Sequence, residues 1–189
     1  MSVASVWRTL LCFTVPVILL AACGGPAEVA RIPLQPAYHS SRDGDLHYRL
    51  PVGWFDATSD SQATRHAVWV LRNDYGASIT VEEINLDASA RMELGEQKLL
   101  QLAQLTMPLL ANDRSAAVQE APVLFSVRER EYCVFELVTF PSDDILRVVV
   151  FDTGQRTYTA TFYTKGEGDG MSREELRAVQ EGFLRSLRW

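Results

Sequence analysis

The second half of the chain contains four apolar stretches that follow one another with only short polar turns between them. The stretches are rich in β-branched and aromatic residues, which is typical of strands. Turns this short join antiparallel neighbours, because parallel strands need a crossover of a dozen or more residues. The pattern therefore predicts a four-stranded antiparallel meander over residues 123–127, 131–140, 145–151 and 156–163.

The first half adds three shorter strand patterns. In residues 46–50 apolar and polar side chains alternate, which predicts a half-buried strand. Residues 66–72 and 77–84 flank the turn-forming residues 73–76, so a hairpin is expected there. Residues 56–64 are polar and predict a turn-rich connection, and Trp54, directly after a Pro-x-Gly corner, is expected to be a buried anchor.

Two segments have the spacing of amphipathic helices. The first runs from Ser89 to about Leu105, with Asp87 or Ser89 as its cap, and is expected to end at Pro108 and residues 112–113. The second begins with a capping box formed by Ser172 and Glu175. The residues sharing one face are Met92, Leu99, Leu102, Ala103 and Thr106 in the first helix, and Leu176, Val179, Phe183 and Leu187 in the second.

This element order predicts an α+β domain in which an antiparallel sheet of about six to seven strands is flanked by helices. With 47% hydrophobic and 22% charged residues, the composition is that of a globular protein and excludes disordered, collagen-like and disulfide-scaffold classes. At roughly 150 ordered residues a chain buries about 68–70% of its unfolded surface, so one self-standing core is expected.

The N-terminal segment indicates secretion. Residues 9–20 are apolar but shorter than the roughly 20 residues that a bilayer-spanning helix needs, and Pro16 interrupts them. The sequence Leu20-Ala21-Ala22-Cys23 that follows resembles the bacterial lipobox. The resemblance implies that residues 1–22 are a lipoprotein signal peptide and that Cys23 becomes the acylated, palmitate-bearing N-terminus. The alternative is cleavage after Ala22 with an incidental Cys23.

The residues after Cys23 bear on localisation and domain organisation. Because Gly24 rather than Asp follows the cysteine, the resemblance implies sorting to the outer membrane, facing the periplasm, in a Gram-negative cell. Residues 23–37 are rich in Gly and Pro and predict a linker, which leaves residues 38–189 as a single domain. Each buried acyl methylene contributes about 0.8 kcal/mol, so two or three chains anchor a protein permanently.

Charge and cysteine usage narrow the function classes. The chain has a net charge of −6, and removal of Arg8 with the signal peptide leaves 17 basic and 24 acidic residues, a charge of −7. Without a basic run, a nucleic-acid partner is not expected.

The three cysteines leave one free thiol in the mature chain. Cys12 leaves with the signal peptide and Cys23 is acylated, so Cys133 has no partner for a disulfide. We expect Cys133 to be a buried small hydrophobe on a strand, beside Phe135 and Leu137.

The inventory of catalytic and metal-ligating residues is sparse. His39, His47 and His66 are scattered and lack the spacing of a metal site. The acidic groups at residues 43–45, 143–144 and 167–169 lack the spacing of an EF-type calcium loop and are expected to be turn residues. No phosphate-binding glycine loop, nucleophile elbow or zinc-protease motif occurs in the sequence. We therefore expect no cofactor, no metal and no enzymatic activity.

Both ends of the predicted domain carry features of a known family. These are Tyr38, Asp43-Gly44-Asp45, the strand 46–50, Pro51-Val52-Gly53-Trp54, the hairpin residues 149–154 and 157–161, and the closing residues 183–189. In these residues the chain resembles the PsbP-like and DcrB-like superfamily and is similar to its bacterial lipoprotein members. The resemblance covers about residues 38–189 and implies a PsbP-like α/β/α sandwich. Members of that superfamily share binding to protein partners without catalysis, and the resemblance transfers no site residue.

Two functions remain open from the sequence. The first is a membrane-anchored lipoprotein of the cell envelope that acts as a non-catalytic module for binding or assembling another envelope protein. The alternative is a small-ligand carrier or hydrolase whose site is assembled from scattered residues such as His47, Asp60 and His66. A pocket with convergent polar groups and shifted pKa values would favour the second function. A filled core with an apolar surface patch would favour the first.

Overall fold

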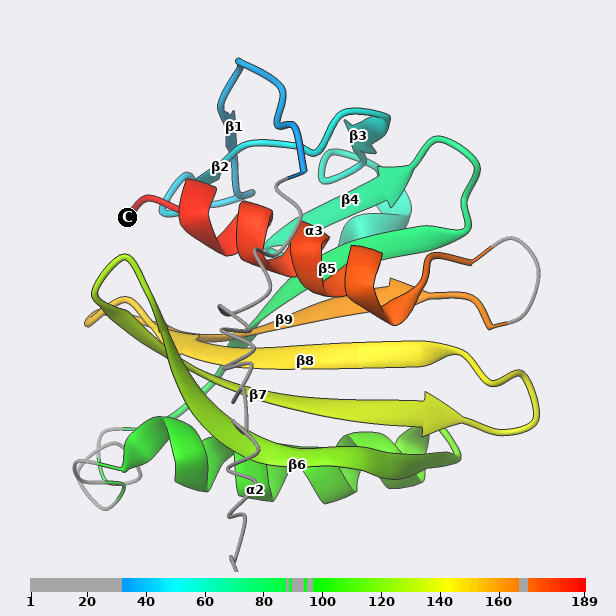
Figure 1. Cartoon of the computed structure of the whole chain (residues 1–189). Coiled ribbons are helices and arrows are strands. Elements are labelled where there is room, and N and C mark those ends of the chain that lie inside the picture. The colour runs from blue at the N-terminus through cyan, green and yellow to red at the C-terminus, as the bar shows by residue number, and fades with distance from the viewer. Residues whose placement is uncertain (1–31, 88, 90–93, 95–96, 167–169) are drawn as a thin grey trace, which may run out of the picture.

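The computed structural model describes residues 32–87, 89, 94, 97–166 and 170–189. Its centre is a seven-stranded antiparallel sheet with the strand order β3-β4-β5-β9-β8-β7-β6 (Figure 1). A separate small sheet pairs β1 with β2. The strands are β1 (His39–Ser40), β2 (His47–Tyr48), β3 (Trp54–Asp56), β4 (Val68–Arg72), β5 (Ala77–Ile84), β6 (Ala116–Val127), β7 (Arg130–Thr139), β8 (Ile145–Asp152) and β9 (Thr157–Thr164).

The predicted meander is confirmed, because β6, β7, β8 and β9 are consecutive neighbours in the sheet. Strand β6 begins at Ala116, however, and not at Val123 as predicted. Apolar and polar side chains do not alternate regularly in its first half, which includes Pro122. The pairing of this half with β7 also shifts register twice, between Val118 and Glu120 and between Glu120 and Val123. An edge strand tolerates proline and bulges, which hid this half of the strand from pattern analysis.

The first half of the chain follows the prediction in part. The β4–β5 hairpin is confirmed, but β3 was missed; its three residues pair with β4. The predicted strand 46–50 forms only the short β2, although Leu46, Tyr48 and Leu50 are buried as its alternation requires. Trp54 is buried as expected, after a corner in which Gly53 has a φ of 86°, a conformation that favours glycine.

Helix α3 (Arg173–Ser186) begins with the predicted capping box of Ser172 and Glu175. Helix α2 (Lys98–Asp113) continues through Pro108, which we had expected to end it. The predicted start at Ser89 falls in a stretch of which the structure describes only residues 89, 94 and 97. Proline removes one backbone hydrogen bond from a helix. Met107 before Pro108 and Leu110 after it both pack on the core, and this burial keeps the helix continuous. Met92, the first residue of the predicted face, lies outside the described residues.

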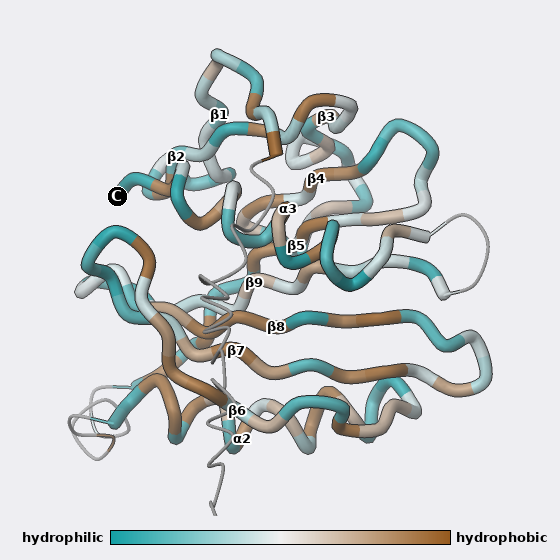
Figure 2. The backbone as a smooth tube through the Cα atoms, viewed as in Figure 1, coloured by the Kyte–Doolittle hydropathy of each residue, from teal (hydrophilic) through white to brown (hydrophobic). Residues whose placement is uncertain are grey.

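The two helices cover opposite faces of the sheet, which gives the α/β/α arrangement. Side chains alternate along β8, so that Val149 and Phe151 belong to the core beneath α3, while Val148 and Val150 belong to the core beneath α2. Figure 2 shows the resulting hydrophobic segments along β7 and β8. Each face of the sheet is filled by an apolar core. A functional site is therefore sought among the surface side chains and among the polar side chains between α3 and the sheet.

The packed part of the chain begins earlier than the predicted domain boundary at Tyr38. Ile32 packs against the core, Leu34 pairs with Pro51, and the Gln35 amide donates a 2.7 Å hydrogen bond to the Leu50 carbonyl. Residues 1–31, which include the predicted signal peptide, Cys23 and most of the predicted linker, lie outside the described residues. None of the described helices is long and apolar enough to span a bilayer.

Candidate functional site

The residues proposed for a scattered catalytic site belong to separate local contacts. His39 Nδ1 lies 3.1 Å from Asp56 Oδ2, and His66 Nδ1 lies 2.8 Å from Glu82 Oε1. Asp60 caps a short 3-10 helix, η1 (Ser61–Ala63), by accepting a hydrogen bond from the Gln62 amide. Within the described ranges, no hydrogen bond or ion pair joins His47, His66 and Asp60, and no group of three or more His, Cys, Asp or Glu side chains could hold a metal ion.

One serine–histidine pair does occur, in the small sheet. Ser40 Oγ and His47 Nδ1 are 2.9 Å apart, and the two residues are opposite each other in the β1–β2 register. A nucleophilic serine needs a base that is itself oriented by a third group. The described residues contain no carboxylate within 4.0 Å of the exposed His47 ring. The contact is therefore a cross-strand hydrogen bond without the third member of a triad.

An open pocket of about 390 Å³ lies beside this pair. Its polar groups largely satisfy one another: Asp56 accepts from the Tyr48 hydroxyl at 2.9 Å, and Arg42 donates to the Thr58 and Ala63 carbonyls. Burial raises the pKa of Tyr48, as does the Asp56 carboxylate, so the phenol stays a donor. The lining residues are Ser40, Ser41, Arg42, Asp56, Thr58 and Ser59.

Cys133 lies on β7 and is fully buried beneath α2 with Phe135 and Leu137, as the sequence predicts. Burial, with a smaller contribution from Glu131, raises the pKa of its thiol to about 11. We expect a thiol reagent at mildly alkaline pH to react with Cys133 more than about 100-fold more slowly in the native protein than in denaturant. Rapid labelling of the native protein, followed by mass spectrometry, would contradict this burial.

A buried network of charged side chains ties α3 to the sheet. Arg147 on β8 donates to Glu136 on β7 and to Glu120 on β6, each at 2.9 Å, and its Nε donates to Gln180 of α3 at 2.8 Å. The Glu136 side chain is 0% exposed and that of Arg147 is 8% exposed. The network was not predicted, because its members come from four elements and no local spacing connects them.

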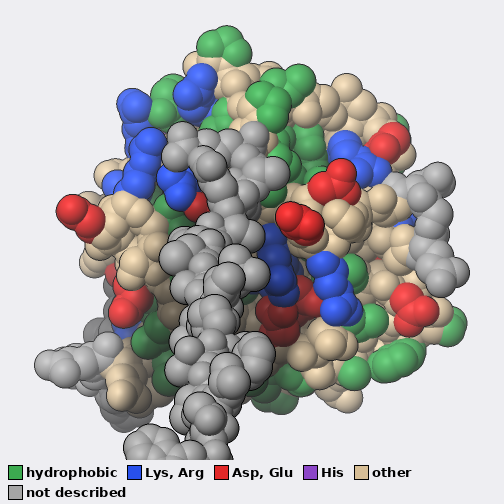
Figure 3. Space-filling view, viewed as in Figure 1, with side chains coloured by type: hydrophobic (Ala, Val, Ile, Leu, Met, Phe, Trp, Pro, Cys, Tyr) green, Lys and Arg blue, Asp and Glu red, His purple; other side chains and the backbone are tan. Residues whose placement is uncertain are grey.

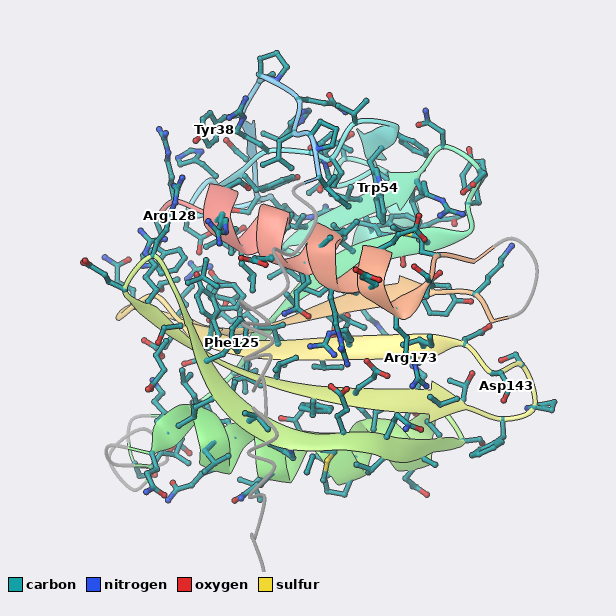
Figure 4. The ribbon with its side chains drawn as sticks, viewed as in Figure 1. Tyr38, Trp54, Phe125, Arg128, Asp143 and Arg173 are labelled. Carbon is teal, nitrogen blue, oxygen red and sulfur yellow. The ribbon has the colours of Figure 1, made fainter. Side chains whose placement is uncertain are left out.

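Two further arginines of α3 complete the network. Arg173 Nε lies 3.2 Å from Glu136 Oε1, and Arg177 forms an ion pair with Glu120. Figure 4 shows Arg173 at the first turn of α3, beside β8 and β7. Every acid in the network faces an arginine, and every arginine faces an acid. Glu136 Oε1 accepts no hydrogen bond, but its charge is compensated by Arg173, and the network holds the helix on the sheet.

The outer surface of α2 has a different character. Leu105 and Leu109, four residues apart, are 62% and 71% exposed. Between Lys98, which pairs with Asp152, and Asp113 the helix has no charged residue. The other exposed residues of this face are uncharged: Gln101, Gln104, Pro108 and Asn112.

Strand β6 extends this apolar surface. Val118 and Leu124 are 47% and 39% exposed, and they pair with Leu137 and Cys133, residues that pack beneath α2. Paired residues of an antiparallel sheet share a face, so Val118 and Leu124 flank the helix. We call Leu105, Leu109, Val118 and Leu124 the α2–β6 surface. The sequence contained a signal for it, since Leu105 and Leu109 lie off the face formed by Leu99, Leu102 and Ala103.

Comparison with known proteins identifies the fold. No protein-family model and no curated protein matches the chain in sequence. Among solved structures, cyanobacterial PsbP (CyanoP) from Synechocystis sp. PCC 6803 matches with a TM-score of 0.56 and 13% identity, over 89% of this chain and 98% of that chain. The Ran-binding protein Mog1p of Saccharomyces cerevisiae matches with a TM-score of 0.58 and 9% identity, over 83% and 95%. The chain therefore has a PsbP-like α+β fold.

Proposed function

We propose that the protein is a membrane-anchored, non-catalytic module of the cell envelope that binds another envelope protein through the α2–β6 surface. The observation that carries this proposal is the exposed, uncharged outer face of α2 with its two leucines. Exposed apolar side chains on an uncharged face are typical of protein–protein interfaces, whose cores are depleted of charge. Mog1p, which shares the fold, is a Ran-binding protein, so the fold is compatible with binding a protein partner.

The anchor in this proposal is Cys23, acylated after removal of residues 1–22, and the location is the periplasmic face of the outer membrane if the cell is Gram-negative. The Leu20-Ala21-Ala22-Cys23 sequence supports it. Because packing on the domain has begun by Ile32, the segment from Cys23 to Ile32 spans at most about 30 Å when fully extended. The anchor would therefore keep the domain close to the bilayer and raise its effective concentration toward membrane partners.

Site-specific photo-crosslinking of the full chain in cells tests the binding surface. A photoreactive amino acid at Leu109 should give one discrete adduct, whereas the same probe at the exposed Ser142 in the β7–β8 turn should not. Adding Leu105→Glu should reduce the Leu109 adduct by about tenfold or more, because a charge would be buried at the centre of the interface. Leu105→Met, which stays apolar, is the matched control. Equal adducts at Leu109 and Ser142 would contradict the proposed surface.

The small-ligand carrier or hydrolase is the second candidate, and the Ser40–His47 contact beside the pocket is the observation that favours it. A panel of esterase, phosphatase, peptidase and glycosidase substrates tests it directly. Turnover that is lost in both Ser40→Ala and His47→Gln, with no position-specific adduct at Leu109, would replace the binding module with an enzyme. We expect no turnover, since the contact lacks an orienting carboxylate among the described residues.

A further inference from the structure

Three arginines stack on two aromatic rings at one end of the molecule. The guanidinium carbon of Arg188 lies 4.2 Å from the centre of the Tyr38 ring, and that of Arg49 lies 5.6 Å from the same ring. Arg130 lies 3.7 Å from the centre of the Trp189 ring. We call these five residues, together with Arg128 of the neighbouring β6–β7 turn, the Arg–aromatic cluster. Figure 4 places Arg128, in the β6–β7 turn, at the same end as Tyr38, and Figure 3 shows basic side chains gathered there.

These arginines differ from most of the other described arginines in having no acidic partner among the described residues. In the part of the chain that the structure describes, no carboxylate lies within 4.0 Å of Arg49, Arg128, Arg130 or Arg188. Glu129 and Glu131 alternate with two of them along the chain but form no ion pair with them. The paired arginines include Arg147, Arg156, Arg173, Arg177 and Arg185.

The unpaired charge is exposed and available to an anion. Arg128 and Arg188 are both exposed, and the structure records no hydrogen bond from either side chain to a described residue. Arg49 donates a hydrogen bond to the Gln35 carbonyl and Arg130 donates one to the Leu187 carbonyl, so neither guanidinium charge is neutralised by these contacts. A guanidinium stacked on a ring stays charged, is weakly hydrated, and matches the geometry of a phosphate.

We propose that this cluster contacts the phosphates of anionic phospholipids and orients the anchored domain on the bilayer. This inference rests on the proposed lipid anchor, which would hold the domain within about 30 Å of the membrane surface. Tyr38 lies only six positions after Ile32, so the cluster lies close in the chain to the anchored end. The rest of an acidic domain is repelled by an anionic surface, and a basic face with aromatic rings is what such a surface attracts.

The proposed orientation leaves the partner-binding surface free. The cluster lies at the end of the molecule that holds the β6–β7 turn, whereas α2 runs along another side (Figures 1 and 4). A domain that rests on the bilayer through the cluster therefore still presents Leu105 and Leu109 to the periplasm. The lipid anchor holds the domain at the membrane, and the Arg–aromatic cluster sets the orientation of the domain on the bilayer.

The experiment measures which end of the domain approaches the lipid. The full acylated chain is reconstituted into vesicles of phosphatidylcholine with phosphatidylglycerol, or of phosphatidylcholine alone, with nitroxide-headgroup lipid as a quencher. A fluorophore is attached at Ser126→Cys, near the β6–β7 turn, or at Ser142→Cys, at the opposite end of β7; both positions are exposed. We expect severalfold stronger quenching at 126 than at 142 in anionic vesicles. High salt should abolish the difference, because screening shortens the range of the attraction.

Charge variants with matched controls decide whether the cluster is responsible. Arg128→Gln with Arg188→Gln should abolish the 126-over-142 difference, whereas Arg65→Gln with Arg114→Gln removes the same charge from other exposed positions and should preserve it. Arg128→Lys with Arg188→Lys keeps the charge and should retain most of the effect, which excludes misfolding as the cause. Equal quenching at both positions in anionic vesicles, or equal effects of the two glutamine pairs, would overturn the proposal. Failure of the anchor can be distinguished from failure of the orientation by vesicle flotation. Without the anchor, the chain would co-float with neither kind of vesicle.

Discussion

Replacing Arg147 with methionine is expected to lower the free energy of unfolding by about 3–5 kcal/mol, the usual cost of removing one partner of a buried ion pair. The substitution would leave Glu136, whose side chain is 0% exposed, with only Arg173 nearby at 3.2 Å. It would also leave Gln180 without its donor. Urea unfolding of the purified protein, followed by far-UV circular dichroism, measures the change.

The control is the same chemical change at a surface ion pair. Arg185 pairs with Glu181 within α3 and its side chain is 45% exposed, so Arg185→Met should cost no more than about 1 kcal/mol. Adding Glu136→Leu to Arg147→Met should recover part of the loss, because the buried carboxylate would be gone. If Arg147→Met proved as mild as Arg185→Met, Arg173 alone would be sufficient to compensate the Glu136 carboxylate.

The elements that the sequence predicted well are those with purely local signals. The meander was recognisable because its turns are short and its strands apolar, and the start of α3 because Ser172 and Glu175 form a capping box three residues apart. Cys133 was placed correctly because it shares a parity with Phe135 and Leu137 on one strand. In each case the determining residues are neighbours in the chain.

The errors arose where distant contacts override local preference. Pro108 normally ends a helix, but packing of Met107 and Leu110 on the sheet keeps α2 continuous. The first half of β6 becomes a strand only because β7 lies beside it. The Arg147 network and the Arg–aromatic cluster join residues far apart in the chain, such as Arg130 and Trp189, so no pattern in a single sequence reveals them.

The candidate binding surface is an intermediate case. Leu105 lay at the end of the predicted helix and outside its predicted face, whereas Leu109 lay beyond the predicted end at Pro108 and belongs to α2 only because the helix continues to Asp113. Their significance became clear only when the structure showed that both are more than half exposed and that the half-exposed Val118 of β6 lies on the sheet face that α2 covers. The sequence could therefore locate the leucines but not the surface to which they belong.

The largest expected effect of any single substitution is that of Cys23→Ser, which should abolish incorporation of labelled palmitate and release the protein from the membrane fraction. The thiol is the only group of the lipobox-like sequence to which diacylglycerol can be attached as a thioether, and a serine hydroxyl does not replace it. Two or three acyl chains at about 0.8 kcal/mol per buried methylene supply the anchoring energy. Without them, the apolar residues 9–20 are shorter than the roughly 20 residues a spanning helix needs.

Cys12→Ser is the matched control, because it makes the same substitution within the apolar segment that is removed with the signal peptide. This variant should keep full palmitate label and stay in the membrane fraction, as should Cys133→Ser, whose thiol is buried in the folded domain. The unprocessed Cys23→Ser precursor should be heavier than the acylated protein by mass spectrometry. If the palmitate label persisted on Cys23→Ser but was lost from Cys12→Ser, the acylated residue would be Cys12 and not Cys23. This result would contradict the proposed anchor. Both the tethered binding module and its orientation by the Arg–aromatic cluster depend on that anchor.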